Sequence, residues 1–211
     1  MTVGYAQRRG NDYNNPIVDD LLLCGRWPRL HTLTLTNLWC SPHTGLNVAA
    51  TFLSSHAHLQ ILHIDLSTSS GLHAAQLVLP INSLPRLRDL KSSREFANAV
   101  LQCPCTAEDG RPLEIIKGVR LTGSGADDKF LRNLKVHGSN SVKRIELLGW
   151  HDMEDLKKLA ECVPKLSWLD LGKRFAGPNG NATVNVCMEG PSSSRLASVP
   201  HANAVGGLNA P

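Results

Sequence analysis

Apolar residues recur along this chain at a spacing that can be written L-x-x-L-x-L. The spacing holds in six segments once isoleucine, valine and one serine are accepted in place of leucine. The segments are Leu30-Leu33-Leu35, Leu59-Leu62-Ile64, Leu87-Leu90-Ser92, Ile116-Val119-Leu121, Val142-Ile145-Leu147 and Leu166-Leu169-Leu171. Their first residues lie 24 to 29 residues apart, which indicates an internal structural repeat.

This pattern predicts a stack of short parallel strands. Side chains alternate between the two faces of a strand, so the fourth and sixth residues of each unit point the same way. One strand cannot bury such a row alone, but stacked units merge their rows into one core. We therefore predict an α/β leucine-rich-repeat solenoid of about six repeats, with a curved parallel sheet on the concave face and helices on the convex face.

The segments between these strands carry helical patterns. Residues 151–163 place Met153, Leu156 and Leu159 on one face and charged residues on the other, with acidic residues in the first turn. Ser92 followed by Glu95 is a capping-box pattern ahead of another helix. Further helices are predicted over 46–53, over 72–79 before Pro80, and after Asp127.

Two units leave their strand register open. The third has Ser92 where a third leucine belongs, and the fourth can be counted from Leu113 instead of Ile116. Because one residue of slip turns a side chain to the other face of a sheet, these two choices decide which residues are exposed.

The pattern divides the chain into three parts. Residues 1–17 form a polar N-terminal segment, 18–172 the repeat array, and 173–211 a tail rich in Gly, Pro, Ser, Asn and Ala. We expect the tail to be disordered. Asp19 to Cys24 has the pattern of a last helical turn with no strand before it, so we expect the array to begin in mid-repeat, leaving an uncapped edge.

Composition and charge exclude several classes. Hydrophobic residues make up 42% of the 211 residues, enough for one continuous core. The net charge of +4 comes from scattered basic residues, whereas a nucleic-acid interface needs them clustered on one face. Residues 1–15 contain no apolar signal-peptide core, and no apolar run reaches a membrane-spanning length. We therefore expect an intracellular protein, cytoplasmic or nuclear, that binds neither nucleic acid nor membrane.

The chemistry-bearing residues do not form a recognisable catalytic or metal site. His56, His58 and His63 are close in sequence, but a helix end, a loop and a strand would point them apart. Cys103-Pro104-Cys105 is not C-x-x-C, and no second pair at zinc spacing occurs. No nucleophile motif or phosphate loop is present. We predict a non-enzymatic protein with no cofactor and no metal, whose six cysteines are reduced thiols.

Three passages resemble the leucine-rich-repeat regions of F-box proteins, especially the large fungal group. They are residues 27–33 (WPRLHTL), 84–90 (LPRLRDL) and 159–166 (LAECVPKL), the last close to the pattern L-A-x-x-C-P-x-L with Val163 inserted. The resemblance covers about 18–172. It implies that the repeats hold a substrate for a cullin-type ubiquitin ligase. No F-box is recognisable in residues 1–17, so docking on the ligase adaptor is expected only if an F-box lies outside this chain.

The third, fifth and seventh residues of each unit should project from the concave sheet, where such folds bind partners. The charged and aromatic residues among them are the predicted partner-binding residues His63, Asp65, Asp89, Lys91, Arg120, Arg144, Glu146, Trp168 and Asp170. An exposed Trp168 flanked by Arg144 and Arg120 would make a binding hot spot, since tryptophan and arginine dominate many interfaces. The alternative is that Trp168 is covered by the tail or is exposed without a role.

The sequence thus favours a non-catalytic protein-protein interaction module, and the resemblance implies the substrate-recognition part of an F-box-like ubiquitin-ligase receptor that binds through the concave sheet. The alternative is a truncated or degenerate repeat fragment with no specific binding role.

Overall fold

A computed structural model describes residues 2–6, 19–40, 44–68, 77–106, 110–174 and 183–186. Strands and helices mostly alternate along the chain. Their bounds are β1 (Thr2–Ala6), α1 (Asp19–Cys24), β2 (Thr32–Cys40), α2 (Gly45–Ser55), β3 (Ile61–Thr68), β4 (Asp89–Lys91), α3 (Arg94–Gln102), β5 (Ile115–Arg120), α4 (Gly125–His137), β6 (Arg144–Trp150), α5 (Met153–Cys162), β7 (Trp168–Arg174) and β8 (Thr183–Val186).

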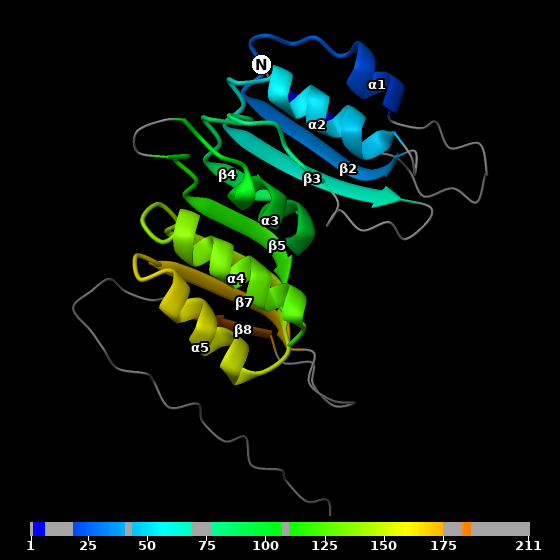
Figure 1. Ribbon diagram of the computed structural model, residues 1–211. Coiled ribbons are helices and arrows are strands. Elements are labelled where there is room, and N and C mark those ends of the chain that lie inside the picture. The colour runs from blue at the N-terminus through cyan, green and yellow to red at the C-terminus, as the bar shows by residue number, and fades with distance from the viewer. Residues whose placement is uncertain are drawn as a thin grey trace, which may run out of the picture.

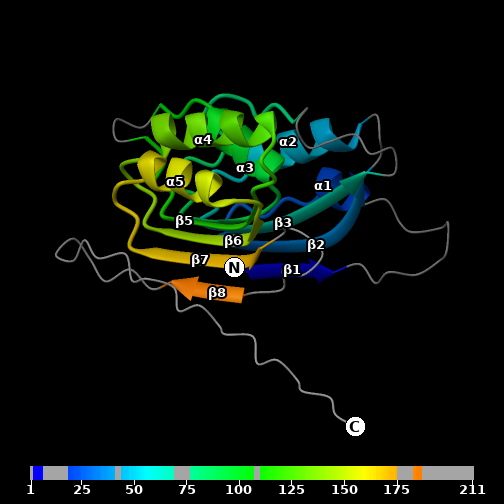
Figure 2. The same ribbon diagram turned by 90° about the horizontal axis from the view of Figure 1, so that it is seen from below.

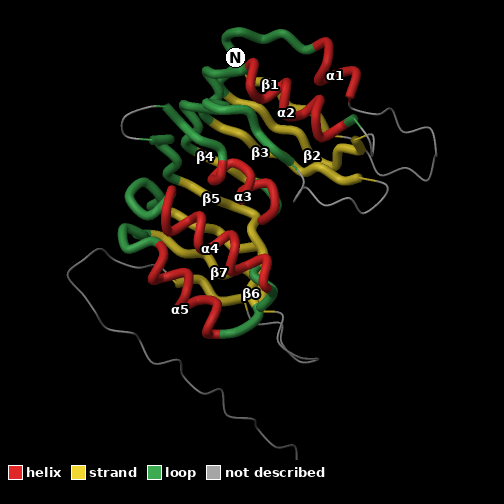
Figure 3. Tube along the Cα trace, viewed as in Figure 1, coloured by secondary structure: helices red, strands yellow, loops and turns green. Residues whose placement is uncertain are grey.

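The strands form one sheet in chain order, with β1 to β7 parallel and β8 antiparallel to β7. Helices α1 to α5 lie on one side of this sheet (Figures 1 and 3). Figure 2 shows the sheet arched, with its β1 and β8 ends bent away from the helices. The predicted α/β class is confirmed, and the arrangement is compatible with a solenoid.

The core consists of aligned columns of apolar side chains. The fourth residues of successive units stand opposite one another in neighbouring strands. These are Leu33, Leu62, Leu90, Ile116, Ile145 and Leu169, each at most 7% exposed. Burying one such side chain contributes about 1.5–3 kcal/mol, so the columns hold the strands in register against the helices.

A repeated backbone hydrogen bond marks each step of the stack. The carbonyl of His31 accepts from the N–H groups of Gln60 and Ile61 at 2.8 and 3.0 Å. The same two-donor bond recurs at Gln60, Arg88, Glu114 and Lys143. Glu114 follows Leu113 as His31 follows Leu30, so the fourth unit is counted from Leu113, not from Ile116.

Gly118 explains why the fourth unit was ambiguous. It lies at the sixth position of the Leu113 unit, where an apolar residue belongs, and has a φ of +82°. A bulge there brings Val119 opposite Leu147, so that Val119 fills the column with 0% exposure. A Cβ on Gly118 would lie 3.0 Å from the carbonyl oxygen of Ser92. Glycine therefore serves both the backbone conformation and the close approach of the neighbouring strand.

The helix predictions are largely confirmed. The helix predicted over 151–163 is α5, capped by Asp152, whose carboxylate accepts from the Asp155 N–H at 3.0 Å. The helix predicted over 46–53 is α2. The cap of α3 is Ser93 rather than Ser92, because the Ser93 hydroxyl accepts from Phe96. Of the helix predicted over 72–79, residues 77–79 are not helical and the rest lies outside the described residues.

Both predicted ends need correction. Thr2–Ala6, within the predicted polar N-terminal segment, forms strand β1 and pairs in parallel with β2, so a strand does precede α1. At the other end β7 continues through Lys173 and Arg174, and β8 pairs with it. Disorder was predicted for the whole tail 173–211. Apart from these strand residues, the tail lies outside the described residues.

Candidate functional site

We call the sheet face opposite the helices the open face; Figure 2 shows this side of the sheet. It carries two rows of aligned side chains. Strand pairing fixes both rows. The first row is Thr32, Ile61, Asp89, Ile115, Arg144 and Trp168; the second is Thr34, His63, Lys91, Lys117, Glu146 and Asp170. Within the described residues, no helix covers this face. Of the nine predicted binding residues, only Asp65 and Arg120 fall outside these rows. The seven inside them are His63, Asp89, Lys91, Arg144, Glu146, Trp168 and Asp170.

Two predicted residues lie elsewhere because of strand geometry. Asp65 is exposed on β3, but β4 ends at Lys91, so no β4 residue is paired opposite it. Arg120 was expected beside Arg144, and this expectation is wrong. The register shifts in β5 place Arg120 opposite Gly149, near the far end of β6.

Counting the fourth unit from Ile116 assigns its third and fifth positions to Gly118 and Arg120. In the structure Ile115 and Lys117 hold these two positions. Counting from Leu113 puts Ile115 third and Lys117 fifth in the unit, and strand pairing places them opposite Arg144 and Glu146. The signal that could have found them is Gly118, because glycine inside a strand often marks a bulge.

Asp89 lies at the centre of the charge pattern on the open face. Its Oδ2 accepts from the Lys117 Nζ at 2.8 Å, and its Oδ1 lies 3.6 Å from the His63 Nε2. The second distance is too long for a hydrogen bond, and it joins opposite charges only when His63 is protonated. Asp89 thus links β4 to β5 across the face, and it also pairs with β3 when His63 is protonated.

Trp168 and Arg144 form the aromatic end of the open face. The Arg144 guanidinium carbon lies 4.9 Å from the centre of the Trp168 ring, within the range of a cation–π contact. Arg144 also pairs with Glu146 at 2.6 Å. Trp168 remains 40% exposed. The predicted Arg144–Trp168 pairing therefore exists, without Arg120.

A buried ion pair lies where α3 and α4 begin. The Arg94 guanidinium pairs with the Asp127 carboxylate and donates to Glu95 at 2.6 Å. The Asp127 Oδ2 also accepts from the N–H groups of Thr122 and Ser124 at 2.7 and 2.9 Å. Asp127 is only 2% exposed. The network joins two successive repeats at their helix starts.

The pKa of Asp127 reflects a competition between burial and hydrogen bonds. Burial by itself would raise the pKa, but the donors from the Ser124 backbone, Arg94 and the Thr122 backbone together outweigh it, so the pKa lies below its usual value. Asp155 holds the corresponding third position of α5. Burial, followed by repulsion from Asp152, raises the pKa of Asp155, and its Oδ2 has no hydrogen-bond partner among the described residues.

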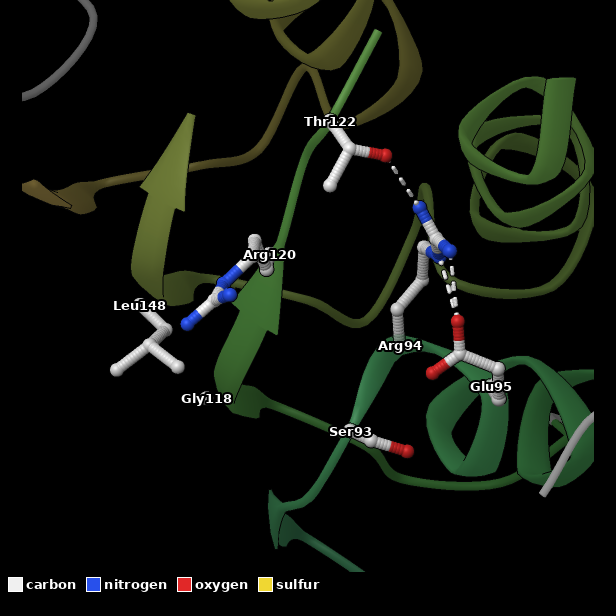
Figure 4. A pocket seen from close by; sticks show the side chains of 7 residues that line it. All are labelled: Ser93, Arg94, Glu95, Gly118, Arg120, Thr122 and Leu148. Carbon is white, nitrogen blue, oxygen red and sulfur yellow. Dashed lines mark hydrogen bonds and ion pairs between the residues drawn. The ribbon is translucent and has the colours of Figure 1, made fainter. Parts of the chain in front are cut away.

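A hollow of about 250 Å³ opens beside this network. Its lining residues are Ser93, Arg94, Glu95, Gly118, Arg120, Thr122 and Leu148. Figure 4 shows Arg120 reaching toward Leu148 on one side and Arg94 with Glu95 on the other. Leu148 is 53% exposed because β6 carries it as an extra residue between those paired with Val119 and Arg120.

A second hollow, of about 480 Å³, lies by Cys103, Cys105 and Arg111. The buried Arg111 guanidinium donates to the carbonyl oxygens of Val100, Ser83 and Leu84 at 2.5, 2.8 and 3.0 Å. Val100 lies in the last turn of α3, where a cation is favourable. Arg111 thus stabilises the end of that helix.

The candidate metal ligands do not converge. Among the described residues, no group of three His, Cys, Asp or Glu side chains could hold a metal ion. Buried His56 instead contacts the Phe52 carbonyl through Nδ1 at 2.7 Å and accepts from the Trp27 N–H at 3.3 Å. The cysteine side chains described at 24, 103, 105 and 162 are free thiols.

No helix in the described part of the chain has the length and apolarity to cross a membrane. No protein-family model, curated protein or solved structure matches the chain.

Proposed function

We propose that this chain is a leucine-rich-repeat module that binds another protein through the open face, without catalysis. The main support for this proposal is the pair of continuous side-chain rows. They present charges of both signs and an exposed Trp168 in cation–π contact with Arg144. Tryptophan and arginine are the residues most enriched at the centres of interfaces. The arched sheet supplies the extended surface that repeat proteins use for binding.

The recognition task that we propose is substrate binding for a cullin-type ubiquitin ligase. Its support is the resemblance of residues 27–33, 84–90 and 159–166 to the repeats of F-box proteins. The shared feature is protein binding by the repeats, and fold alone does not fix function. We do not propose that this chain itself docks on the ligase adaptor.

Affinity capture from the source cell tests the open face. We expect a variant carrying Lys117→Ala, Arg144→Glu and Trp168→Ala to lose specific partners by at least tenfold, since hot-spot truncations cost about 2 kcal/mol or more. The matched control carries Lys129→Ala, Arg132→Glu and Met153→Ala, which changes the charge equally at exposed positions on the helical side. Quantitative mass spectrometry measures the captured proteins.

The two variants are compared after circular dichroism has shown that both fold. Retention of every partner by the open-face variant would contradict the proposal. Equal background capture by all three chains would instead favour a repeat fragment without a binding role. Ubiquitin among the partners lost would support the ligase task.

A further inference from the structure

The second row of the open face changes the sign of its charge from one half to the other. In strand order from β3 to β7 it reads His63, Lys91, Lys117, Glu146 and Asp170. Neighbouring strands lie about 4.7–4.9 Å apart, so residues of like sign stand side by side along the row. Such an arrangement favours a partner whose charges run in the opposite order.

The first row already neutralises part of this charge. Lys117 pairs with Asp89 at 2.8 Å, and Glu146 pairs with Arg144 at 2.6 Å. His63 faces the same Asp89 at 3.6 Å. These side chains therefore offer a partner little uncompensated charge.

Lys91 and Asp170 are the charges of this row that no ion pair neutralises within the described residues. Lys91 is exposed and forms no ion pair there. Asp170 is half-buried, and its Oδ1 accepts from the Gly172 N–H at 3.0 Å, but no described cation pairs with it. Trp168, two residues before Asp170 on the same face, is 40% exposed. A cation that binds Asp170 therefore lies beside an aromatic ring, where cation–π attraction adds to the ion pair.

The spacing of these two charges limits the shape of a partner. Lys91 on β4 and Asp170 on β7 are three strand spacings apart, about 14–15 Å between their backbones. The sheet is arched with its ends bent away from the helices, so side chains on the open face converge and shorten this distance (Figure 2). Residues i and i+4 of an extended chain are about 13–14 Å apart and point to the same side. In a helix the same two residues would be only about 6 Å apart.

We propose that the open face binds an extended segment of a partner protein in which three residues separate an acidic from a basic residue. The segment crosses the strands, with its carboxylate at Lys91 and its cation at Asp170 beside Trp168. The proposal rests on the proposed function, because it uses the same face. It adds the chemistry and the spacing of the partner's charges.

Peptide titrations followed by ¹⁵N–¹H NMR at low salt test this spacing. The probe is a serine- and glycine-rich peptide in which three residues separate one glutamate from one arginine. The control peptide has the same composition with glutamate and arginine adjacent. We expect the probe to shift the amide signals of Lys91 and Asp170 and the indole N–H signal of Trp168. The control should bind about fivefold more weakly, because it meets only one of the two charges at a time.

Charge reversal on the protein separates recognition from folding. Lys91→Glu should weaken binding of the probe and strengthen binding of a second peptide, in which lysine replaces the glutamate. Damage to the fold would weaken both peptides instead of reversing the preference. Lys129→Glu, an equal charge change at an exposed position of α4, should leave both affinities unchanged. If Lys91→Glu does not fold, the comparison of the peptides on the unmodified chain decides.

Three results would overturn the proposal. They are equal binding of the probe and the adjacent-charge control, an unreversed preference in a folded Lys91→Glu variant, and no shifts at Lys91 and Asp170 up to the solubility limit. If one of them appears while the open-face variant still loses partners in affinity capture, the charge spacing fails and the proposed function stands. If the open-face variant keeps every partner, the proposed function itself fails.

Discussion

Replacing Asp127 by alanine should destabilise the fold by about 3 kcal/mol, as measured by urea denaturation at pH 7. The substitution leaves Arg94 without its buried partner and removes the acceptor of the Thr122 and Ser124 N–H groups. Removing one member of a buried ion pair typically costs about 3–5 kcal/mol, and the partial exposure of Arg94 at 15% reduces this.

Asp128→Ala is the matched control, because it removes a neighbouring carboxylate from the same first turn. Asp128 is exposed and pairs with Lys158 at 3.2 Å on the surface, where ion pairs contribute at most about 1 kcal/mol. Equal losses from the two substitutions would contradict the assigned role of Asp127.

The pH dependence of stability should separate Asp127 from Asp155. The pKa of Asp127 is lowered on folding, so its contribution is complete above the unfolded-state pKa of about 3.9 and is lost as the pH falls through the lower folded value. The pKa of Asp155 is raised, so its effect is favourable at low pH and is lost as the pH rises through the folded value. Asp155→Asn should therefore not reduce stability at pH 7.

Replacing Gly172 by alanine should cost about 3 kcal/mol or more and displace β7. A Cβ there would lie 2.8 Å from the carbonyl carbon and oxygen of Leu148, and closer still to the Leu147 oxygen. These are backbone atoms of β6, so relief requires β7 to move. Because β7 carries Trp168, we also expect altered tryptophan fluorescence and weaker partner binding.

Gly123→Ala separates this clash from backbone strain. Gly123 and Gly172 both have a positive φ, +71° and +59°, but the nearest atom to a Cβ on Gly123 is a His151 ring carbon at 3.5 Å. Strain of this kind costs about 1–3 kcal/mol. A loss for Gly172→Ala no greater than that for Gly123→Ala would contradict the close packing of β6 and β7.

Much of the fold could be predicted from the apolar spacing, because the buried columns are local patterns. Strand β1 was missed because Thr2–Ala6 is too short to show the full repeat. Strand β8 was missed because it is antiparallel and lies among glycine and asparagine residues. The pattern could not settle the fourth register either, since the bulge at Gly118 lets both counts place an apolar residue in the core.

The candidate site could be predicted less completely. On every strand except β5, the alternation of side chains between the two faces predicted which residues lie in the two rows. It also predicted the contact of Arg144 with Trp168. Lys117 required the correct register. The Arg94–Asp127 pair joins residues 33 positions apart, and no periodic signal connects them. The hollow likewise depends on residues from the start of α3, from β5 and the loop after it, and from β6.

Photo-crosslinking from single positions tests open-face recognition most directly. A benzophenone amino acid would replace Thr34, His63 or Lys91 on the open face, or Lys129, Arg132 or Lys165 at exposed positions outside it, in the source cell. We predict discrete partner adducts from the open-face positions that excess unmodified chain abolishes, and none from the other set. Adducts only from the second set, or equally from both, would contradict recognition through the open face.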